Sequence, residues 1–174
     1  MDIRLRQQTL LIMDKIYNKV SIEETKVSCG SLAEGLDLPG SDKDVLFVLN
    51  DVQIIQNVQD MNRSARCTTF LVDDDIEFPG YFRLKLIAVG DQIYIFTLPE
   101  CFAKTKNGIY VLSPAFLRKL IETAPHYKLY EHGPSLTDKD RVLDIVFCFH
   151  LYSWPRQAEK WICRHRSGQW PKDI

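Results

Sequence analysis

The most informative stretch of this sequence is GSLAEGLDLPGSDKDVL, residues 30–46. Gly30 and Ser31 follow a short apolar segment and precede residues with helical character, which predicts a strand that turns into a brief helix. Free backbone N–H groups at such a turn bind phosphate, and a glycine lets the phosphate approach the chain closely. Gly30 and Ser31 are therefore candidate phosphate-binding residues.

Two aspartates, Asp42 and Asp44, stand two residues apart at the start of an apolar segment that reads as a strand. Alternate strand residues share a face, which places their Cα atoms roughly 6.6 Å apart. Two like charges this close repel each other unless a cation lies between them. Because Mg²⁺ is bound by one or two carboxylates together with substrate phosphates, the pair predicts a site for Mg²⁺ or Mn²⁺. The alternative is a solvated acidic turn.

Asp144 is the candidate for a third carboxylate, which two-metal phosphoryl transfer uses to hold ions ~3.5–4 Å apart. The segment 141–151 predicts a strand with one wholly apolar face, and Asp144 lies between two valines on the other face. An aspartate in that position is costly unless it is paired or bound to metal. The alternative is an aspartate at a strand end that caps a neighbouring loop.

The composition describes an ordinary globular protein. The chain has 174 residues, of which 45% are hydrophobic and 26% charged, and this excludes disordered, collagen-like and coiled-coil proteins. There are 22 Lys and Arg residues against 23 Asp and Glu, so the net charge is −1. A general nucleic-acid-binding protein is far more basic, so any polyanion site must be a local patch. We expect residues 1–174 to form one domain or one lobe.

The cysteines and the apolar runs indicate a cytoplasmic protein. Five cysteines are present without a C-x-x-C pair, which is typical of free thiols in a reducing compartment and gives no support to a zinc ribbon. No apolar signal core follows Met1. The longest apolar runs are too short to span a bilayer, so no membrane partner is expected.

The hydrophobic pattern mixes helices with several strands, which predicts an α+β or mixed α/β fold. Residues 2–20 read as an amphipathic helix, with Leu10, Met13, Tyr17 and Val20 on one stripe and Arg4, Gln8, Lys15 and Lys19 on another. The other expected elements are strands at 27–29, 44–49, 68–72, 82–89, 92–96 and 141–151, and helices at 31–36, from Ser113 and from Pro155.

Several motifs together resemble a known family, the cyclic GMP-AMP synthase-like nucleotidyltransferases, which belong with the male-abnormal (Mab) proteins in the DNA polymerase β-like superfamily. The likeness covers about residues 1–171 and is greatest to invertebrate members. It implies a nucleotidyltransferase core, with a central mixed sheet flanked by helices and a long N-terminal helix. The matching segments, in the expected order, are 30–31, 34–36, 38–42, Asp44, 79–81, 132–135, 143–146, 153–155 and 170–171.

The resemblance implies a role for each candidate residue. Gly30 and Ser31 would contact the triphosphate, and Asp42 and Asp44 would hold two Mg²⁺ ions. Asp144 would complete the metal site and help to deprotonate a ribose hydroxyl. The implied reaction joins ATP and GTP into a cyclic dinucleotide with release of pyrophosphate, as a second messenger in innate immunity.

The implied activator is double-stranded RNA or DNA. In family sensors an early helix contacts the duplex, so the resemblance implies contacts from Arg4, Lys15 and Lys19, and the alternative is a solvated basic face. The His and three clustered Cys of the vertebrate zinc insertion do not occur, so recognition of DNA in particular is not implied.

Two departures from the family pattern leave alternatives open. Lys43 stands where the family has an apolar residue, and it either contacts phosphate or points to solvent. The family's C-terminal helical lobe has no counterpart after residue 171, so we expect that lobe to be absent. One alternative is therefore a catalytically inactive or truncated member that acts as a binding or regulatory module. Another is a small stand-alone transferase that adds one nucleotide to its substrate.

Overall fold

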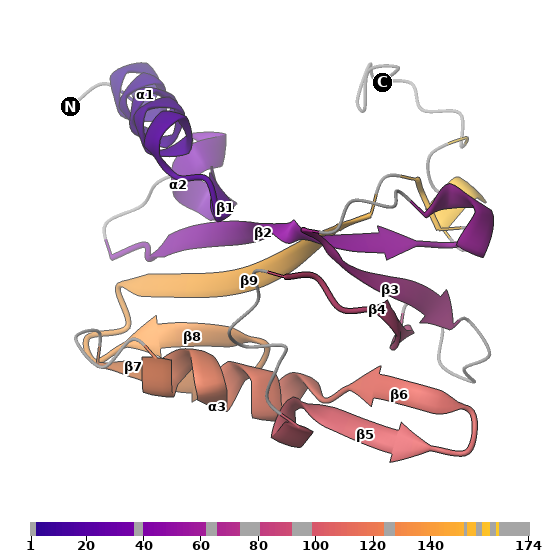
Figure 1. Cartoon of the computed structure of the whole chain (residues 1–174). Coiled ribbons are helices and arrows are strands. Elements are labelled where there is room, and N and C mark those ends of the chain that lie inside the picture. The colour runs from indigo at the N-terminus through magenta and orange to yellow at the C-terminus, as the bar shows by residue number, and fades with distance from the viewer. Residues whose placement is uncertain are drawn as a thin grey trace.

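The computed structural model describes residues 3–36, 40–61, 66–73, 81–91, 99–123, 128–151, 153–155, 158–160 and 163. Within these residues, nine strands form one curled, mixed sheet in the order β5-β6-β4-β3-β2-β9-β8-β7, with β1 paired to β2 (Figure 1). The predicted α+β class is confirmed. The elements are α1 Ile3–Val20, β1 Glu24–Cys29, α2 Gly30–Glu34, β2 Lys43–Ile55, η1 Val58–Asp60, β3 Thr68–Asp73, β4 Arg83–Ala88, η2 Pro99–Cys101, β5 Phe102–Thr105, β6 Gly108–Val111, α3 Ser113–Thr123, β7 Leu129–His132, β8 Ser135–Asp138 and β9 Leu143–Leu151.

Helices α1 and α3 pack against the same face of the sheet. Tyr17 of α1 lies 5.8 Å from Phe47 of β2 between ring centroids, and Phe47 stacks on Phe147 of the parallel strand β9. Phe149, two residues further along β9, meets Phe116 of α3 at 5.7 Å. Because alternate strand residues share a face, one continuous helix-covered face results. Its buried core cluster is Val52, Ile54, Phe70, Phe116, Leu117, Leu136 and Ile145.

An irregularity in β2 keeps this long central strand facing the core. Leu49 pairs with Phe149, but the next paired residue of β2 is Gln53, opposite His150. The extra residues form a bulge, which bends the strand and resets the alternation of its side chains. As a result, odd-numbered residues such as Leu49 face the core before the bulge, and even-numbered ones such as Ile54 face it afterwards.

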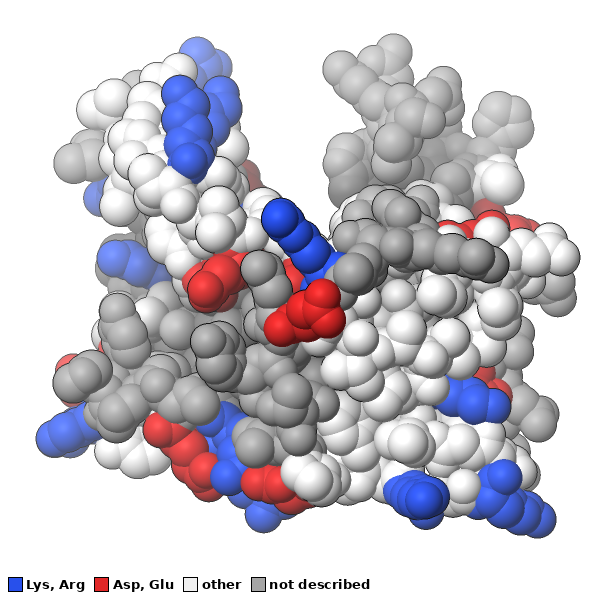
Figure 2. Space-filling view, in the orientation of Figure 1, with Lys and Arg blue, Asp and Glu red and all other residues white. Residues whose placement is uncertain are grey.

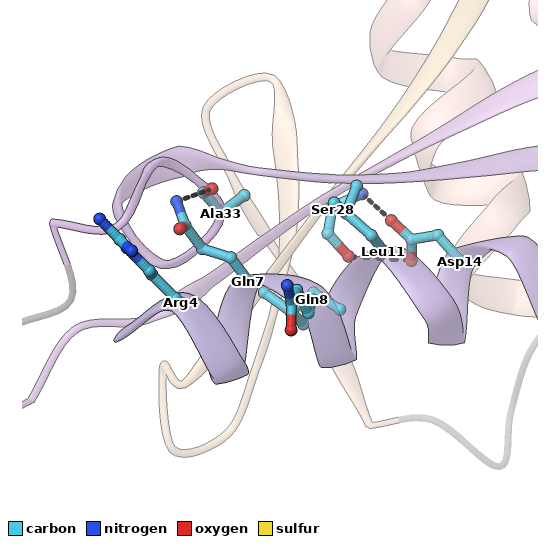
Figure 3. A pocket seen from close by; sticks show the side chains of 8 residues that line it. Arg4, Gln7, Gln8, Leu11, Asp14, Ser28 and Ala33 are labelled. Atoms are coloured by element: carbon cyan, nitrogen blue, oxygen red, sulfur yellow. Dashed lines mark hydrogen bonds between the residues drawn. The ribbon is translucent and has the colours of Figure 1, made fainter. Parts of the chain in front are cut away.

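A buried carboxylate holds α1 against β1. Asp14 is 8% exposed and accepts hydrogen bonds from the Ser28 backbone N–H at 2.7 Å and the Ser28 hydroxyl at 3.0 Å. The Lys26 ammonium lies 3.3 Å from the same carboxylate. About two helical turns before Asp14, Gln7 donates a hydrogen bond to the Ala33 carbonyl at 3.0 Å and so links α1 to α2 (Figure 3). These contacts frame a cavity of about 320 Å³ between the three elements.

We expect Asp14→Ala to lower the free energy of unfolding by about 2–3 kcal/mol, because it leaves a partly buried N–H without a partner and a cation without its counter-charge. Ser28→Ala is the matched control. It removes only the hydroxyl bond and is expected to lower that free energy by about 1 kcal/mol. Urea denaturation measures both. Equal effects of the two substitutions would contradict the role assigned to Asp14.

Some expectations from the sequence need correction. The N-terminal helix is present as Ile3–Val20, but Met13 and Val20 of its expected apolar stripe are 53% and 77% exposed. The helix contacts the sheet through the edge of that stripe, where Tyr17 lies, and through the polar Asp14. The strands expected at 27–29 and 44–49 extend to Glu24–Cys29 and Lys43–Ile55, since β1 pairs with β2 along its whole length and β2 continues past its bulge to pair with β3. The expected strand at 92–96 and most of the helix expected from Pro155 lie outside the described residues.

Candidate metal centre

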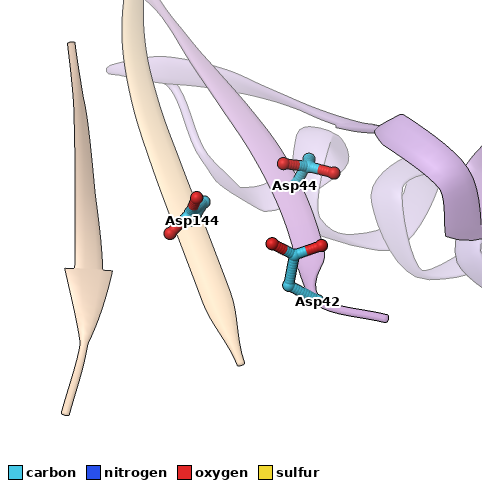
Figure 4. A group of neighbouring side chains, drawn as sticks. All are labelled: Asp42, Asp44 and Asp144. Atoms are coloured by element: carbon cyan, nitrogen blue, oxygen red, sulfur yellow. The ribbon is translucent and has the colours of Figure 1, made fainter. Parts of the chain in front are cut away.

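The three predicted carboxylates meet at one place on the sheet. Asp42 immediately precedes β2, Asp44 is the second residue of β2, and Asp144 is the second residue of β9. The two strands are parallel, and Asp44 lies directly opposite Asp144. One carboxylate oxygen from each residue lies within 4.8 Å of the other two (Figure 4). Residues separated by a hundred positions in the chain thus form one cluster on the face opposite to the helix-covered face.

Backbone contacts at the start of both strands fix this register. The Lys43 N–H donates to the Val142 carbonyl at 2.8 Å, which aligns the first residues of β2 and β9. In the turn before β9, the Asp138 carboxylate accepts the N–H groups of Val142 at 2.7 Å and Leu143 at 3.2 Å. A carboxylate that accepts two successive backbone N–H groups holds the turn in place. The position of Asp144 relative to Asp44 is therefore set by the backbone.

The electrostatics of the cluster favour a bound cation. Burial, followed by the negative charges of Asp42 and Asp144, raises the pKa of the Asp44 carboxyl. Cys29, which lies opposite Asp44 on β1, has its thiol pKa raised first by burial and then by the charge of Asp44. A divalent cation among the three carboxylates would relieve this repulsion, and hard oxygen donors are the ligands that Mg²⁺ prefers. The donor set therefore fits Mg²⁺ or Mn²⁺.

Gly30 brings the strand-to-helix turn against this cluster. The residue begins α2 with φ +68°, a conformation that favours glycine. A Cβ atom at this position would lie 1.8 Å from Oδ2 of Asp44. No side chain fits there, and the backbone of Gly30, the first of the two predicted phosphate-binding residues, therefore adjoins Asp44.

Gly30→Ala is expected to destabilise the protein and displace the Asp44 carboxylate. Gly133→Ala is the matched control, because Gly133 has a similar φ of +62° but no atom within 4 Å of its would-be Cβ. Left-handed strain alone accounts for roughly 1–2 kcal/mol in the control, and Gly30→Ala should exceed it because of the clash. Thermal unfolding of the two variants measures the difference. Equal losses of stability would show that the contact between Gly30 and Asp44 is unimportant.

The predicted cationic contacts lie elsewhere on the molecule. Lys43 is exposed and pairs with Leu143, so strand alternation places it on the face opposite to that of Asp44. Arg4, Lys15 and Lys19 are exposed on α1, where Figure 2 shows cationic side chains gathered. Their contacts with phosphate or a nucleic-acid duplex stay predictions.

The structure places a histidine beside the cluster that the residue types and spacings in the sequence did not indicate. Nδ1 of His132, on β7, lies 3.7 Å from Oδ2 of Asp144. Strand β8 lies between β7 and β9, so the imidazole reaches across one whole strand. A Gly-Pro turn follows His132 and signals a tight connection, but nothing local in the sequence predicts which strand the resulting hairpin joins.

The paired registers reveal a row of polar side chains across five strands. Each directly opposite pair shares a face of the sheet. The row therefore continues from the carboxylates in both directions, outward to β1 on one side and to β8 and β7 on the other. Its members, in order, are Cys29, Asp44, Asp144, Thr137 and Tyr130.

Comparisons with protein-family models, with curated proteins and with solved structures found no match. Among the described residues, no helix combines the length and the hydropathy needed to cross a membrane. The geometry of the carboxylate cluster and the motifs in the sequence are therefore the basis for a proposed function.

Proposed function

We propose that this chain is a nucleotidyltransferase core of the cyclic GMP-AMP synthase-like type, which joins ATP and GTP into a cyclic dinucleotide with the help of Mg²⁺ or Mn²⁺. The observation that carries the proposal is the convergence of Asp42, Asp44 and Asp144 within 4.8 Å. The sequence predicts these three residues for this chemistry, and nothing local in the sequence brings β9 beside β2. A cluster formed by chance has no reason to include the predicted third aspartate.

In the proposed reaction, Asp42 and Asp44 would hold the divalent cations and Asp144 would complete the site. Gly30, whose backbone adjoins Asp44, and Ser31 would bind the triphosphate. Asp144 would accept the proton of the ribose hydroxyl that attacks the α-phosphorus, and pyrophosphate would leave. When bound, the cations would neutralise the phosphates and the developing charge on the attacking and leaving oxygens.

The electrostatics support the same proposal. Burial and the charges of Asp42 and Asp144 all raise the pKa of Asp44, so the ionised cluster is unfavourable in the absence of a cation. Like charges gathered on paired strands destabilise a sheet, and their retention favours a binding role over a packing role.

The test is a product assay with radiolabelled ATP and GTP, with Mg²⁺ or Mn²⁺, and with or without double-stranded RNA or DNA. It uses this chain and the longest natural polypeptide that contains it. We expect a labelled cyclic dinucleotide that resists phosphatase and is lost in Asp42→Asn, Asp44→Asn and Asp144→Asn. No labelled product from either polypeptide under any condition would contradict the synthase.

A second candidate function is a binding or regulatory module, and the surface of α1 favours it. Large apolar side chains on this helix are about half exposed or more: Ile3, Leu5, Leu11, Ile12, Met13, Ile16 and Val20. Arg4, Lys15 and Lys19 are exposed beside them, while the helix's one acidic residue, Asp14, is buried. An exposed apolar stripe next to cations is typical of an interaction surface.

Calorimetry separates the two functions. The synthase predicts that ATP binds in the presence of Mn²⁺ and that Asp42→Asn removes this binding. A module without catalytic function predicts no metal-dependent binding of ATP by either protein. Leu11→Gln with Ile16→Gln, which alter only the exposed surface of α1, should leave ATP binding unchanged in both cases.

A further inference from the structure

The side chain of Thr137 is buried next to the carboxylate cluster. Thr137 lies directly opposite Asp144 in the antiparallel pair of β8 and β9, so the two side chains share a face. The residue is 6% exposed, and its hydroxyl has no hydrogen-bond partner among the described residues. A buried hydroxyl that makes no hydrogen bond destabilises a fold, and valine has nearly the same shape without that cost. Packing therefore does not explain a threonine here.

The Asp144 carboxylate is the complementary group. Within the part of the chain that the structure describes, the Asp144 carboxylate lies 3.7 Å from the His132 imidazole, which is longer than a hydrogen bond. Carboxylates that bind metals are normally oriented by a hydrogen-bond donor behind them. Asp144 has no such donor among the described residues. The Thr137 hydroxyl is a donor that has no acceptor among them.

His132 lies on the same face of the sheet as this hydroxyl. It pairs with Ser135 in the hairpin of β7 and β8, and its imidazole reaches Asp144 across β8. Ser135 and Thr137 are alternate residues of β8, so both lie on the face that the imidazole crosses. The Thr137 hydroxyl therefore shares this face with Asp144 and is shielded from water.

We propose that Thr137 is a positioning residue, whose hydroxyl donates a hydrogen bond to the Asp144 carboxylate when that carboxylate holds a divalent cation. This inference rests on the proposed function, because it assigns a donor to the third carboxylate of the metal site. Thr137 touches neither substrate nor cation, and it acts only through the orientation of Asp144.

Mn²⁺ titration of the whole chain, together with thermal unfolding without metal, tests this inference. Thr137→Val should weaken the affinity for Mn²⁺ by about 10–100-fold, as loss of a group that orients a ligand does elsewhere. The same substitution should leave the unfolding midpoint equal or higher, because it removes an unpaired buried hydroxyl. Thr137→Ser keeps the hydroxyl and should retain the affinity. Thr137→Ala replaces the valine variant if that variant does not fold.

Ser135→Ala is the matched control, since it removes a buried hydroxyl from the same strand and face, one that donates to the His132 carbonyl instead. It should leave Mn²⁺ affinity unchanged. The inference is overturned if Thr137→Val binds Mn²⁺ like the wild type, or if Thr137→Ser or Ser135→Ala weakens binding as much as Thr137→Val. If Asp44→Asn abolishes Mn²⁺ binding in the same series, the proposed function remains supported even when the role of Thr137 is overturned. Failure of the wild type to bind Mn²⁺ would contradict both.

Discussion

Asp44→Asn is expected to weaken Mn²⁺ binding by more than ~100-fold, since residues that only orient a ligand already contribute up to that factor. Asp44 is the central carboxylate, two residues from Asp42 in the sequence and directly opposite Asp144. An amide in its place supplies no charge to a divalent cation. Asp91→Asn, an exposed acidic residue after β4, is the control and should bind Mn²⁺ as the wild type does. Equal affinity of the two variants would contradict a metal site at Asp44.

The same substitution is expected to make the cation-free protein more stable. Because burial and two neighbouring charges raise the pKa of Asp44, the folded state binds its proton more tightly than the unfolded state does. The contribution of Asp44 to stability therefore falls as pH rises from the usual Asp pKa of about 3.9 through the raised value. Asp44→Asn removes this pH-dependent loss of stability. At pH values above the raised pKa, the unfolding midpoint of the variant should therefore exceed that of the wild type, and below the usual Asp pKa the two midpoints should be similar. A lower midpoint at neutral pH would contradict the repulsion.

Phe70→Ala should produce the largest loss of stability, about 3–5 kcal/mol, as expected for a large aromatic side chain removed from a core. Phe70 is fully buried on β3 and lies 6.1 Å from Phe149 of β9 between ring centroids. It pairs with Ile54, ten residues along β2 from Asp44. Chemical denaturation measures the loss, with Phe70→Leu as the control that keeps most of the apolar volume.

Mn²⁺ binding by folded Phe70→Ala should match that of the wild type, because Phe70 packs in the core beside the half of β2 that is far from Asp44. This separates the stability of the sheet from the chemistry of its carboxylates. A loss below 1 kcal/mol would show that Phe70 is outside the core, and a large drop in Mn²⁺ affinity would show that the two halves of β2 are coupled.

The parts of the fold that follow from local pattern were predictable from the sequence. The alternation in residues 143–151 predicted both the apolar face of β9 and the position of Asp144 on the other face, and the core confirms this. The spacing of Asp42 and Asp44 predicted that they share a face. The turn at Gly30 and the helix from Ser113 also follow from local signals, namely a glycine at the end of a strand and Ser-Pro at a helix start.

The remaining features depend on which segments pair, and local pattern carries no such information. The bulge between Leu49 and Gln53 becomes visible only when β2 is aligned with β9. The hairpins β5–β6 and β7–β8 have strands of four residues, too short for a clear period. The contact between His132 and Asp144 requires three strands in a particular order. On α1, the contacts of Asp14 outweigh the hydrophobic pattern, so the polar residue faces inward.

Anomalous X-ray scattering from crystals soaked in Mn²⁺ shows whether Asp42, Asp44 and Asp144 bind divalent cations together. We expect anomalous peaks among the three carboxylates, within coordination distance of an oxygen atom from each residue, and no such peaks in crystals of Asp44→Asn. Anomalous peaks only at other acidic residues, or none at the cluster in crystals with saturating Mn²⁺, would show that the three carboxylates do not form a metal site.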